Sequence, residues 1–242
     1  MLNLAALQFK PSLGKVEENL SKVLFLLKYV KEESIVVLPE MWFCGFDYDN
    51  LKSHAKRTEE VLEEIKRASL QRDLTIIGTY PLEGQEGIYN CALVVEEGKI
   101  IGKRHKIKLF PLYEEEKHFK RGQDNPLIES KRAKIGILIC FELRFSSLLL
   151  RDAEVLAVPS MWGKKRKEHL EALSRSRAIE NQSFLVLSNA WGKVGQEEYA
   201  GSSAIYSPWG EVLAYSEKGD SLLQVEVEKQ QVYVVRRYIP LS

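Results

Sequence analysis

The sequence is poor in the residues that cross-link small secreted domains or bind metal ions. Only three of its 242 residues are cysteines, and they lack the spacing of a disulfide framework. The four histidines are scattered, without the close spacing that is typical of zinc ligands. These absences favour a protein of the reducing cytoplasm, and they predict neither a metal site nor a cofactor.

The sequence also lacks a charge excess of either sign and a long apolar run. Lys and Arg together number 35, against 34 for Asp and Glu, so net charge provides no attraction to nucleic acid or membrane surfaces. No apolar run approaches the length of a bilayer span, and the N-terminus lacks the basic region of a signal peptide. We therefore expect no nucleic-acid or membrane partner. We expect residues 1–242 to form a single domain with a large core.

The sequence does contain an alternation of buried-strand and amphipathic-helix patterns. Short apolar segments predict strands at 4–9, 35–38, 74–78, 135–139, 155–158, 185–187 and 222–227. Helices are expected from Gly14 to Val30, from an N-cap at Thr58, over 148–150 and over 168–182. Two predicted hairpins, 89–95 with 99–106 and 204–207 with 211–215, indicate mixed sheets. The alternation predicts the α/β class.

Polar side chains that can carry chemistry follow three of these strands. Cys140 comes directly after 135–139, and a sharp turn there would expose its thiol to a pocket. Taken alone, Cys140 is better explained as a buried thiol, because free cysteine packs like a small hydrophobic residue. Glu40 after 35–38 and a lysine-rich segment at the end of 99–106 change that interpretation. A carboxylate, an ammonium and a thiol at strand ends can together form a nucleophilic site.

Five motifs in this order resemble those of the nitrilase superfamily of carbon–nitrogen hydrolases. They are Leu-Pro-Glu40, Lys106-Ile-Lys-Leu-Phe, Cys140-Phe-Glu-Leu-Arg144-Phe, Arg177-Ala-Ile-Glu180-Asn181-Gln and Gly201-Ser-Ser with Pro208-Trp-Gly210. The resemblance extends from Leu4 to about Val227, nearly the whole chain. It implies a four-layer α-β-β-α sandwich, a small-molecule substrate, and subunits that pair as a dimer or a larger homo-oligomer.

The resemblance also implies a role for each residue of the site. Cys140 is the nucleophile, and Glu40 is the general base that takes its proton and later activates water. Lys106 and the backbone N–H of Phe141 stabilise the oxyanion. Strand alternation does not distinguish Lys106 from the lysines two residues away, so this choice depends on the family pattern. Lys108 stands where the family usually has histidine, which leaves its own role open.

A second glutamate belongs to the site of the enzymes that the chain resembles, in a loop ahead of a phenylalanine and a glycine. The longest predicted loop, 109–125, contains three candidates, Glu114, Glu115 and Glu116. Counting back from the phenylalanine and the glycine favours Glu115, which would position the lysine and the substrate. The other two glutamates would then be solvated acids.

Three aromatic residues are candidates for the substrate pocket: Trp162, Phe43 and Tyr113. Aromatic side chains are more often core than pocket, so the pattern alone does not separate the two. Arg144 is expected beneath the nucleophile, where it would hold a carboxylate or loop carbonyls. Asn90 matches a family position but is expected to be structural.

Arg177 and Glu180 lie one helical turn apart and are expected to pair with each other. They match family positions, but their spacing is that of a structural pair. The basic run at 164–167 is either a solvated surface or an attraction for an anionic substrate tail.

These residues predict thiol-dependent hydrolysis of a non-peptide C–N bond. An amide is the favoured substrate, ammonia the product and a thioester the intermediate. The compact length, the Pro159-Ser-Met-Trp162 segment and the Arg177 motif resemble ω-amidases, which act on dicarboxylate monoamides. Nitrilases and N-carbamoyl amidohydrolases share the same Glu-Lys-Cys triad and are alternatives. A papain-like hydrolase that uses His169, and a non-catalytic binding protein of the same fold, are alternatives of other classes.

Overall fold

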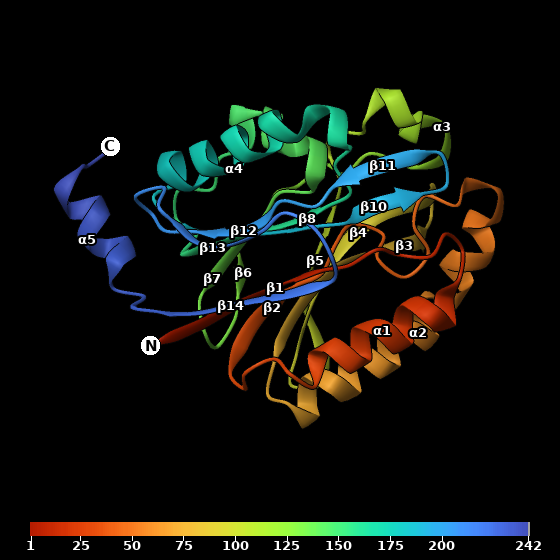
Figure 1. The fold of residues 1–242 in the computed structure, drawn as a ribbon, viewed down its shortest axis with the longest axis horizontal. Coiled ribbons are helices and arrows are strands. Elements are labelled where there is room, and N and C mark those ends of the chain that lie inside the picture. The colour runs from red at the N-terminus through yellow and green to blue at the C-terminus, as the bar shows by residue number, and fades with distance from the viewer. Residues whose placement is uncertain (242) are drawn as a thin grey trace.

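Two six-stranded sheets lie face to face in the computed structural model, which describes residues 1–241 (Figure 1). The first sheet has the order β14 (Ser221–Val227), β1 (Leu2–Gln8), β2 (Ser34–Val37), β3 (Thr75–Gly84), β4 (Gly87–Glu96) and β5 (Lys99–His105). The second has the order β13 (Val212–Ser216), β12 (Ser203–Tyr206), β9 (Phe184–Asn189), β8 (Val155–Ser160), β7 (Lys134–Ile137) and β6 (Ile128–Glu129). The strands β10 (Trp191–Val194) and β11 (Glu197–Ala200) form a separate hairpin.

Helices cover the outer faces of both sheets. The first sheet is covered by α1 (Val16–Leu27) and α2 (Leu51–Gln71), and the second by α4 (Lys167–Asn181) (Figure 1). The short helix α3 (Glu115–His118) lies at the end of the sandwich that carries β10 and β11, and α5 (Gln231–Tyr238) lies at the opposite end. The predicted four-layer α-β-β-α sandwich is confirmed. Among residues 1–241, no helix combines the length and the apolar character needed to cross a bilayer.

The central strands are apolar on both faces because both faces are covered. In β1, Leu4 and Ala6 belong to the core between the two sheets, whereas Ala5 and Leu7 belong to the core beneath α1 and α2. All four of these side chains are fully buried. Since successive side chains of a strand point to opposite faces, one apolar run contributes to two cores.

The sheets bring the ends of several strands to one edge of the sandwich. In the first sheet β1, β2 and β3 are parallel, and in the second β7, β8 and β9 are parallel. Glu40, just after β2, donates its N–H to the carbonyl of Ser160 at the end of β8 over 3.2 Å. Because β5 is separated from β3 by two antiparallel pairings, it ends at the same edge. Residues that follow β2, β5, β7 and β8 therefore come together.

The start of the second helix differs from the prediction. Thr58 does not cap a helix but is buried inside α2, which begins at Leu51. Its hydroxyl donates to the carbonyl of Pro81 over 2.7 Å. A threonine followed by two glutamates has the local pattern of a helix start, but here the threonine serves a tertiary contact to β3.

The segment after β7 also differs from the prediction. The helix predicted over 148–150 is absent, and two 3₁₀ turns, Cys140–Arg144 and Ser146–Leu148, take its place. The predicted loop 109–125 includes α3, and the strands β6, β10 and β11 had no clear pattern in the sequence. Both predicted hairpins are confirmed, as β4 with β5 and β12 with β13.

Candidate active site

Lys106 lies at the centre of a buried cluster of polar side chains. Its Nζ donates to Glu40 Oε1 and to Glu115 Oε1, each over 2.7 Å. None of these three residues is more than 1% exposed. Asn90, which was expected to be only structural, donates from Nδ2 to Glu40 Oε1 over 2.8 Å. The backbone N–H of Met161 donates to Glu40 Oε2 over 3.3 Å, so both oxygens of this carboxylate are held.

The cluster is assembled from three separate elements. Glu40 follows β2, Lys106 follows β5, and Glu115 is carried by α3. The backbone of Lys106 is bonded on both sides: its N–H donates to the carbonyl of Asn90, and its carbonyl accepts from the N–H of Gly122, each over 2.8 Å. These two bonds fix the direction of the lysine side chain.

Burial and the oppositely charged neighbours have opposing effects on the pKa values of Lys106 and Glu115. Burial lowers the pKa of Lys106, but Glu115 and Glu40 outweigh that effect, and the pKa is raised well above its ordinary value. Lys106 is therefore a fixed cation. Burial raises the pKa of Glu115 to about 7; Lys106 opposes the rise and Glu40 adds to it. Glu115 therefore titrates near neutral pH.

Cys140 begins the 3₁₀ turn that follows β7, and its backbone is strained. Its φ of +47° lies in the left-handed region that residues other than glycine rarely adopt. Arg177 on α4 supports the turn from behind, because its Nε donates to the carbonyl of Leu143 over 2.9 Å. Arg177 also pairs with Glu180, which confirms that prediction.

Glu142 ties this turn to the segment that carries the lysine. Its Oε2 accepts the N–H of Ile139 over 2.7 Å. Its Oε1 accepts the N–H groups of Ile107 and Lys108, over 2.7 and 3.1 Å. The buried guanidinium of Arg104 balances its charge. The carboxylate of Glu142 thus fixes the turn that begins at Cys140 relative to the segment that follows Lys106.

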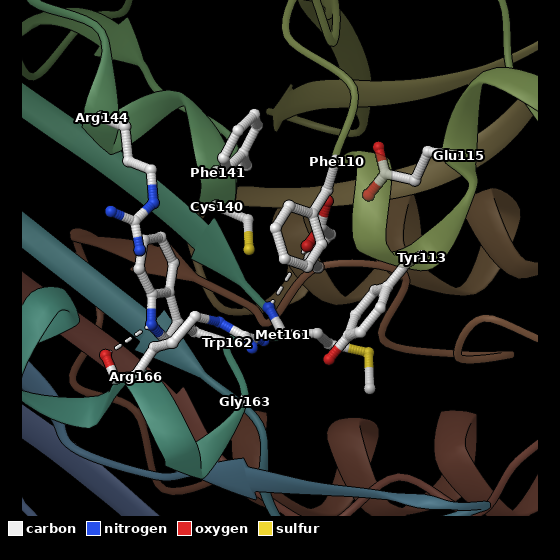
Figure 2. A pocket seen from close by; sticks show the side chains of 11 residues that line it. Phe110, Tyr113, Glu115, Cys140, Phe141, Arg144, Met161, Trp162, Gly163 and Arg166 are labelled. Carbon is white, nitrogen blue, oxygen red and sulfur yellow. Dashed lines mark hydrogen bonds between the residues drawn. The ribbon is translucent and has the colours of Figure 1, made fainter.

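The thiol of Cys140 faces a pocket that Glu40 and Glu115 also line (Figure 2). The pocket contains about 280 Å³ of empty space, part of it open to solvent. Its other lining residues are Phe110, Tyr113, Phe141, Arg144, Met161, Trp162, Gly163 and Arg166. Burial, followed by Glu40, raises the pKa of the Cys140 thiol above its ordinary value, although Lys106 opposes the rise. The resting group is therefore a thiol that needs a base when it attacks.

Two of the three aromatic residues predicted to line the pocket do so, Trp162 and Tyr113. The prediction for Phe43 is wrong. Its ring is fully buried in the core beneath α1 and α2, 5.5 Å from the ring of Trp42 and 5.9 Å from that of Tyr80. The chain turns back on itself after β2, so this side chain faces the outer core of the first sheet.

Only one of the three neighbouring glutamates enters the pocket, and it is Glu115. Glu114 pairs with Lys117 over 2.6 Å and Glu116 pairs with Arg121 over 3.3 Å, both at the surface. Glu114 has a φ of +51°, so the chain changes direction immediately before α3 and points the next side chain inward.

Arg144 does not hold the backbone beneath the nucleophile, contrary to the expectation from sequence. Its guanidinium lies 4.9 Å over the ring of Trp162, and Nη2 is 3.0 Å from Nδ1 of His169. Lys108 is not among the residues that line the pocket; its Nζ lies 5.1 Å over the ring of Phe145.

Sequence reasoning missed one group that holds the carboxylate of Glu40, the backbone N–H of Met161. A backbone donor has no signature in the sequence, because every residue other than proline carries one. Arg166 could be predicted only as a member of the basic run 164–167, with nothing to mark it as the member that faces the pocket.

A base and a thiol therefore line one pocket, and the base is paired with the buried fixed cation Lys106. Such groups can deprotonate the thiol and stabilise the negative charge that develops as sulfur attacks a carbonyl carbon. This is the chemistry of acyl transfer through a covalent intermediate. Among residues 1–241, no group of three or more His, Cys, Asp or Glu side chains could hold a metal ion.

Comparison with known proteins agrees with this chemistry. The family model of carbon-nitrogen hydrolases matches residues 3–237. A 2-oxoglutaramate amidase of Bacillus subtilis is 31% identical over 246 residues, which cover 98% of this chain and 95% of that protein. The omega-amidase YafV of Escherichia coli K12 is 30% identical over 191 residues, 78% of this chain and 74% of that protein.

Solved structures show the same fold at lower sequence identity. XC1258 of Xanthomonas campestris, a CN-hydrolase superfamily protein, superposes with a TM-score of 0.93 at 21% identity, covering 99% of this chain and 95% of the other. Nit3 of Saccharomyces cerevisiae, a nitrilase superfamily member, has a TM-score of 0.90 at 23% identity, with coverages of 100% and 95%. With the family match over nearly its whole length, the chain belongs to the carbon–nitrogen hydrolases.

Proposed function

We propose that this hydrolase is a cysteine-dependent ω-amidase, which releases ammonia from the amide end of a dicarboxylate monoamide. The observation that carries the proposal is a pair of guanidinium groups, Arg144 and Arg166, that line the pocket beside Cys140 (Figure 2). A substrate whose amide lies on the thiol can direct its distal carboxylate toward these arginines. The names of the Bacillus and Escherichia relatives support the same substrate class.

Both arginines are available to an anion. Neither forms an ion pair within residues 1–241; aromatic rings hold them instead, with Arg144 over Trp162 and Arg166 over Phe110 at 4.9 and 5.2 Å. Burial, together with the positive charge of Arg166, lowers the pKa of Arg144. A carboxylate bound between the two groups would relieve this repulsion, which favours an anionic substrate.

Two lysines of the basic run are directed elsewhere. Lys164 pairs with Glu198 and Lys167 pairs with Glu217, each over 2.7 Å. Neither lysine lines the pocket. Recognition of the carboxylate is therefore assigned to Arg166 within the run 164–167, with Arg144 as its partner.

In the first half of the reaction the thiol is acylated. Glu40 accepts the proton of Cys140, and the sulfur attacks the amide carbon to form a tetrahedral intermediate. Lys106 and the backbone N–H of Phe141 stabilise its oxyanion. Glu40 then returns the proton to the amide nitrogen, ammonia leaves, and a thioester remains on Cys140. Glu115 holds Lys106 in position during these steps.

In the second half the thioester is hydrolysed. Glu40 takes a proton from a water molecule, whose oxygen attacks the thioester carbon. The same donors stabilise the second oxyanion, the C–S bond breaks, and Cys140 regains its proton from Glu40. The products are ammonia and a dicarboxylate.

A substrate panel tests the proposal. We expect ammonia release to be fastest from monoamides of short dicarboxylic acids, and much slower from the matching amides without the distal carboxylate. Preference for an uncharged nitrile, or for an N-carbamoyl amino acid, would contradict the ω-amidase assignment.

The choice of nucleophile and base needs a separate test. Cys140→Ala should abolish amide hydrolysis, whereas His169→Ala should leave the rate nearly intact, because His169 is exposed and does not line the pocket. A large loss in the histidine variant would favour a papain-like mechanism. Incubation with an activated ester should acylate Cys140, which mass spectrometry would detect as a mass increase. That result would exclude the alternative that the protein only binds a ligand and does not catalyse a reaction.

We also propose that the whole chain acts as one catalytic domain, paired with a second copy of itself in the cytoplasm. The three cysteines are free and buried, which suits a reducing compartment. Large apolar side chains remain exposed near one end of the sandwich, on α4, on β13 and its preceding turn, and on α5: Ile179, Trp209, Val212, Tyr215 and Tyr238. A second subunit would cover them.

A further inference from the structure

Ser160, the last residue of β8, has a buried hydroxyl group without a hydrogen-bond partner. The residue is 0% exposed, and within residues 1–241 its Oγ is among the few buried polar side-chain atoms that no protein group satisfies. An unsatisfied buried hydroxyl costs free energy, so its presence calls for an explanation. Its main chain is firmly held, because its carbonyl accepts the N–H groups of Glu40 and Ala190, each over 3.2 Å.

The pairing of β7 and β8 brings this hydroxyl beside the nucleophile. The strands are parallel, with Ile137 opposite Ala157, and the N–H of Leu138 extends the ladder by donating to the carbonyl of Ala157 over 3.0 Å. The pairing ends at Ile137 and Ala157, each three residues before Cys140 and Ser160. Met161, which follows Ser160, lines the same pocket as Cys140 and donates its N–H to the carboxylate of Glu40. Ser160 therefore stands next to the site, on its β8 side.

We propose that Ser160 is a further catalytic residue, whose hydroxyl donates a hydrogen bond to the sulfur of Cys140 when that sulfur carries negative charge. This role rests on the proposed use of Cys140 as the nucleophile. The thiol proton moves to Glu40, and the sulfur's electron pair forms the bond to the amide carbon. Ser160 keeps its own proton throughout and only stabilises the charge on sulfur.

The electrostatics of the thiol agree with this geometry. Burial and Glu40 raise the pKa of Cys140, whereas Lys106, Ser160 and the backbone N–H of Met161 lower it. Sulfur is negatively charged twice in each turnover, before it attacks and again when it leaves the thioester. A donor at this position therefore assists both half-reactions.

The size of the effect follows from the chemistry of thiolates. A tenfold gain in thiolate is partly offset by a loss of intrinsic nucleophilicity of about threefold, for a Brønsted coefficient of about 0.5. The remaining gain is about threefold, so we expect Ser160→Ala to lower kcat/KM by about that factor. Stabilisation of the departing thiolate belongs to hydrolysis of the thioester and would lower kcat further where that step limits turnover.

The test combines alkylation, turnover and melting of the full-length enzyme. The rate at which iodoacetamide modifies Cys140, followed by mass spectrometry, should fall about threefold in Ser160→Ala, together with kcat/KM. The melting temperature should stay the same or rise, because the deleted hydroxyl has no protein partner. Ser160→Thr keeps the hydroxyl on a strand-favouring residue and should restore both rates.

Ser174→Ala provides the matched control. Ser174 is also 0% exposed with an unsatisfied hydroxyl, but it lies on the outer helix α4 rather than at the end of a strand. Its substitution should change neither rate.

An alkylation rate in Ser160→Ala equal to that of the wild type would overturn the proposal, as would a loss of melting temperature that accounts for the lost activity. Alkylation requires no substrate, so failure of the wild type to hydrolyse monoamides would overturn the proposed function separately.

Discussion

Lys106 and Lys108 are neighbours in sequence but lie in very different surroundings. Lys106 is fully buried between Glu40 and Glu115, whereas Lys108 is half-buried against the ring of Phe145. If Lys106 stabilises the oxyanion, Lys106→Met should lower kcat/KM by about 100- to 1,000-fold, roughly 3–4 kcal/mol of transition-state stabilisation. Lys108→Met should cost far less. Steady-state kinetics on a monoamide measures both.

This comparison requires both variants to fold. Loss of Lys106 leaves two buried carboxylates without their cation and can destabilise the protein strongly. Circular dichroism and thermal melting should therefore precede the kinetics. Equal losses in two folded variants would show that the two lysines share the role, and a larger loss in Lys108→Met would reassign it.

Glu115 makes the site sensitive to pH near neutrality. Its pKa is raised from 4.5 to about 7, chiefly by burial, and its carboxylate form is the one that holds Lys106. We expect kcat/KM to rise with pH through about 7 in the wild type. Glu115→Gln should lack this rise and should be less active throughout. A pH–rate profile of both proteins measures the difference.

The same pKa has the opposite consequence for stability. The native state keeps a proton on Glu115 that the unfolded chain loses near pH 4.5, so this group's stabilising contribution is complete below pH 4.5 and lost as pH rises through about 7. The melting temperature of the wild type should accordingly fall over this range relative to Glu115→Gln. Parallel melting curves would mean that Glu115 does not titrate there.

At the scale of elements, the 3₁₀ turn Lys164–Arg166 carries one basic side chain that faces the surface and another that faces the pocket. Lys164 points to Glu198 on β11, while Arg166 lines the pocket. Arg166→Ala should lower kcat/KM for a monoamide about 10- to 100-fold, because a hydrogen bond to a charged group contributes about 1.5–3 kcal/mol. For an amide without a distal carboxylate the loss should be small.

Lys164→Ala serves as the matched control for that experiment. It removes a positive charge from the same turn but only an exposed ion pair, which contributes little. Equal effects of the two substitutions on the monoamide would indicate general attraction by the basic run rather than a contact from Arg166.

The segment around the turn Cys140–Arg144 could be predicted from the sequence only in part. The strand before it and the position of Cys140 at its end were predictable, because apolar β-branched residues mark a buried strand. A sharp turn at Cys140 was also predicted, but its 3₁₀ form was not, since it depends on Glu142 bonding to residues of a distant segment, Ile107 and Lys108. The short apolar segment that follows was consequently mistaken for a helix.

At the scale of the whole molecule, the exposed apolar side chains predict an oligomer. Val212 on β13 is 55% exposed and lies in the apolar surface described above. Val212→Glu should shift the protein from dimer to monomer, because an interface core excludes an unpaired charge. Light scattering coupled to size-exclusion chromatography measures the mass directly.

Phe25 provides the control for this experiment. It is also 55% exposed, but it lies on α1, in the helical layer on the other side of the sandwich. Phe25→Glu should leave the mass unchanged. A wild-type protein that is monomeric at every concentration would contradict the proposed pairing.

The sequence by itself determined the alternation of strands and helices in this protein, whereas the four layers followed from its resemblance to a known family. Strand and helix periods are local properties of the chain, and they were sufficient to predict the alternation of elements. Glu40 and Cys140 stood out only together with Lys106, because the motifs around the three resemble those of one enzyme family in the same order; Cys140 taken alone is better explained as a buried thiol.

Only the tertiary structure decided which of several similar neighbours face the pocket. Glu115 rather than Glu114 enters it, and Phe43 lies in the core although its composition and position suited a pocket wall. Ser160 has no distinctive pattern in the sequence, and its place next to the site depends on the pairing of β7 with β8 and on the bond from the N–H of Glu40 to its carbonyl. The direction of a side chain at a turn depends on contacts between segments far apart in the chain. The pattern of neighbouring residues in the sequence cannot predict those contacts.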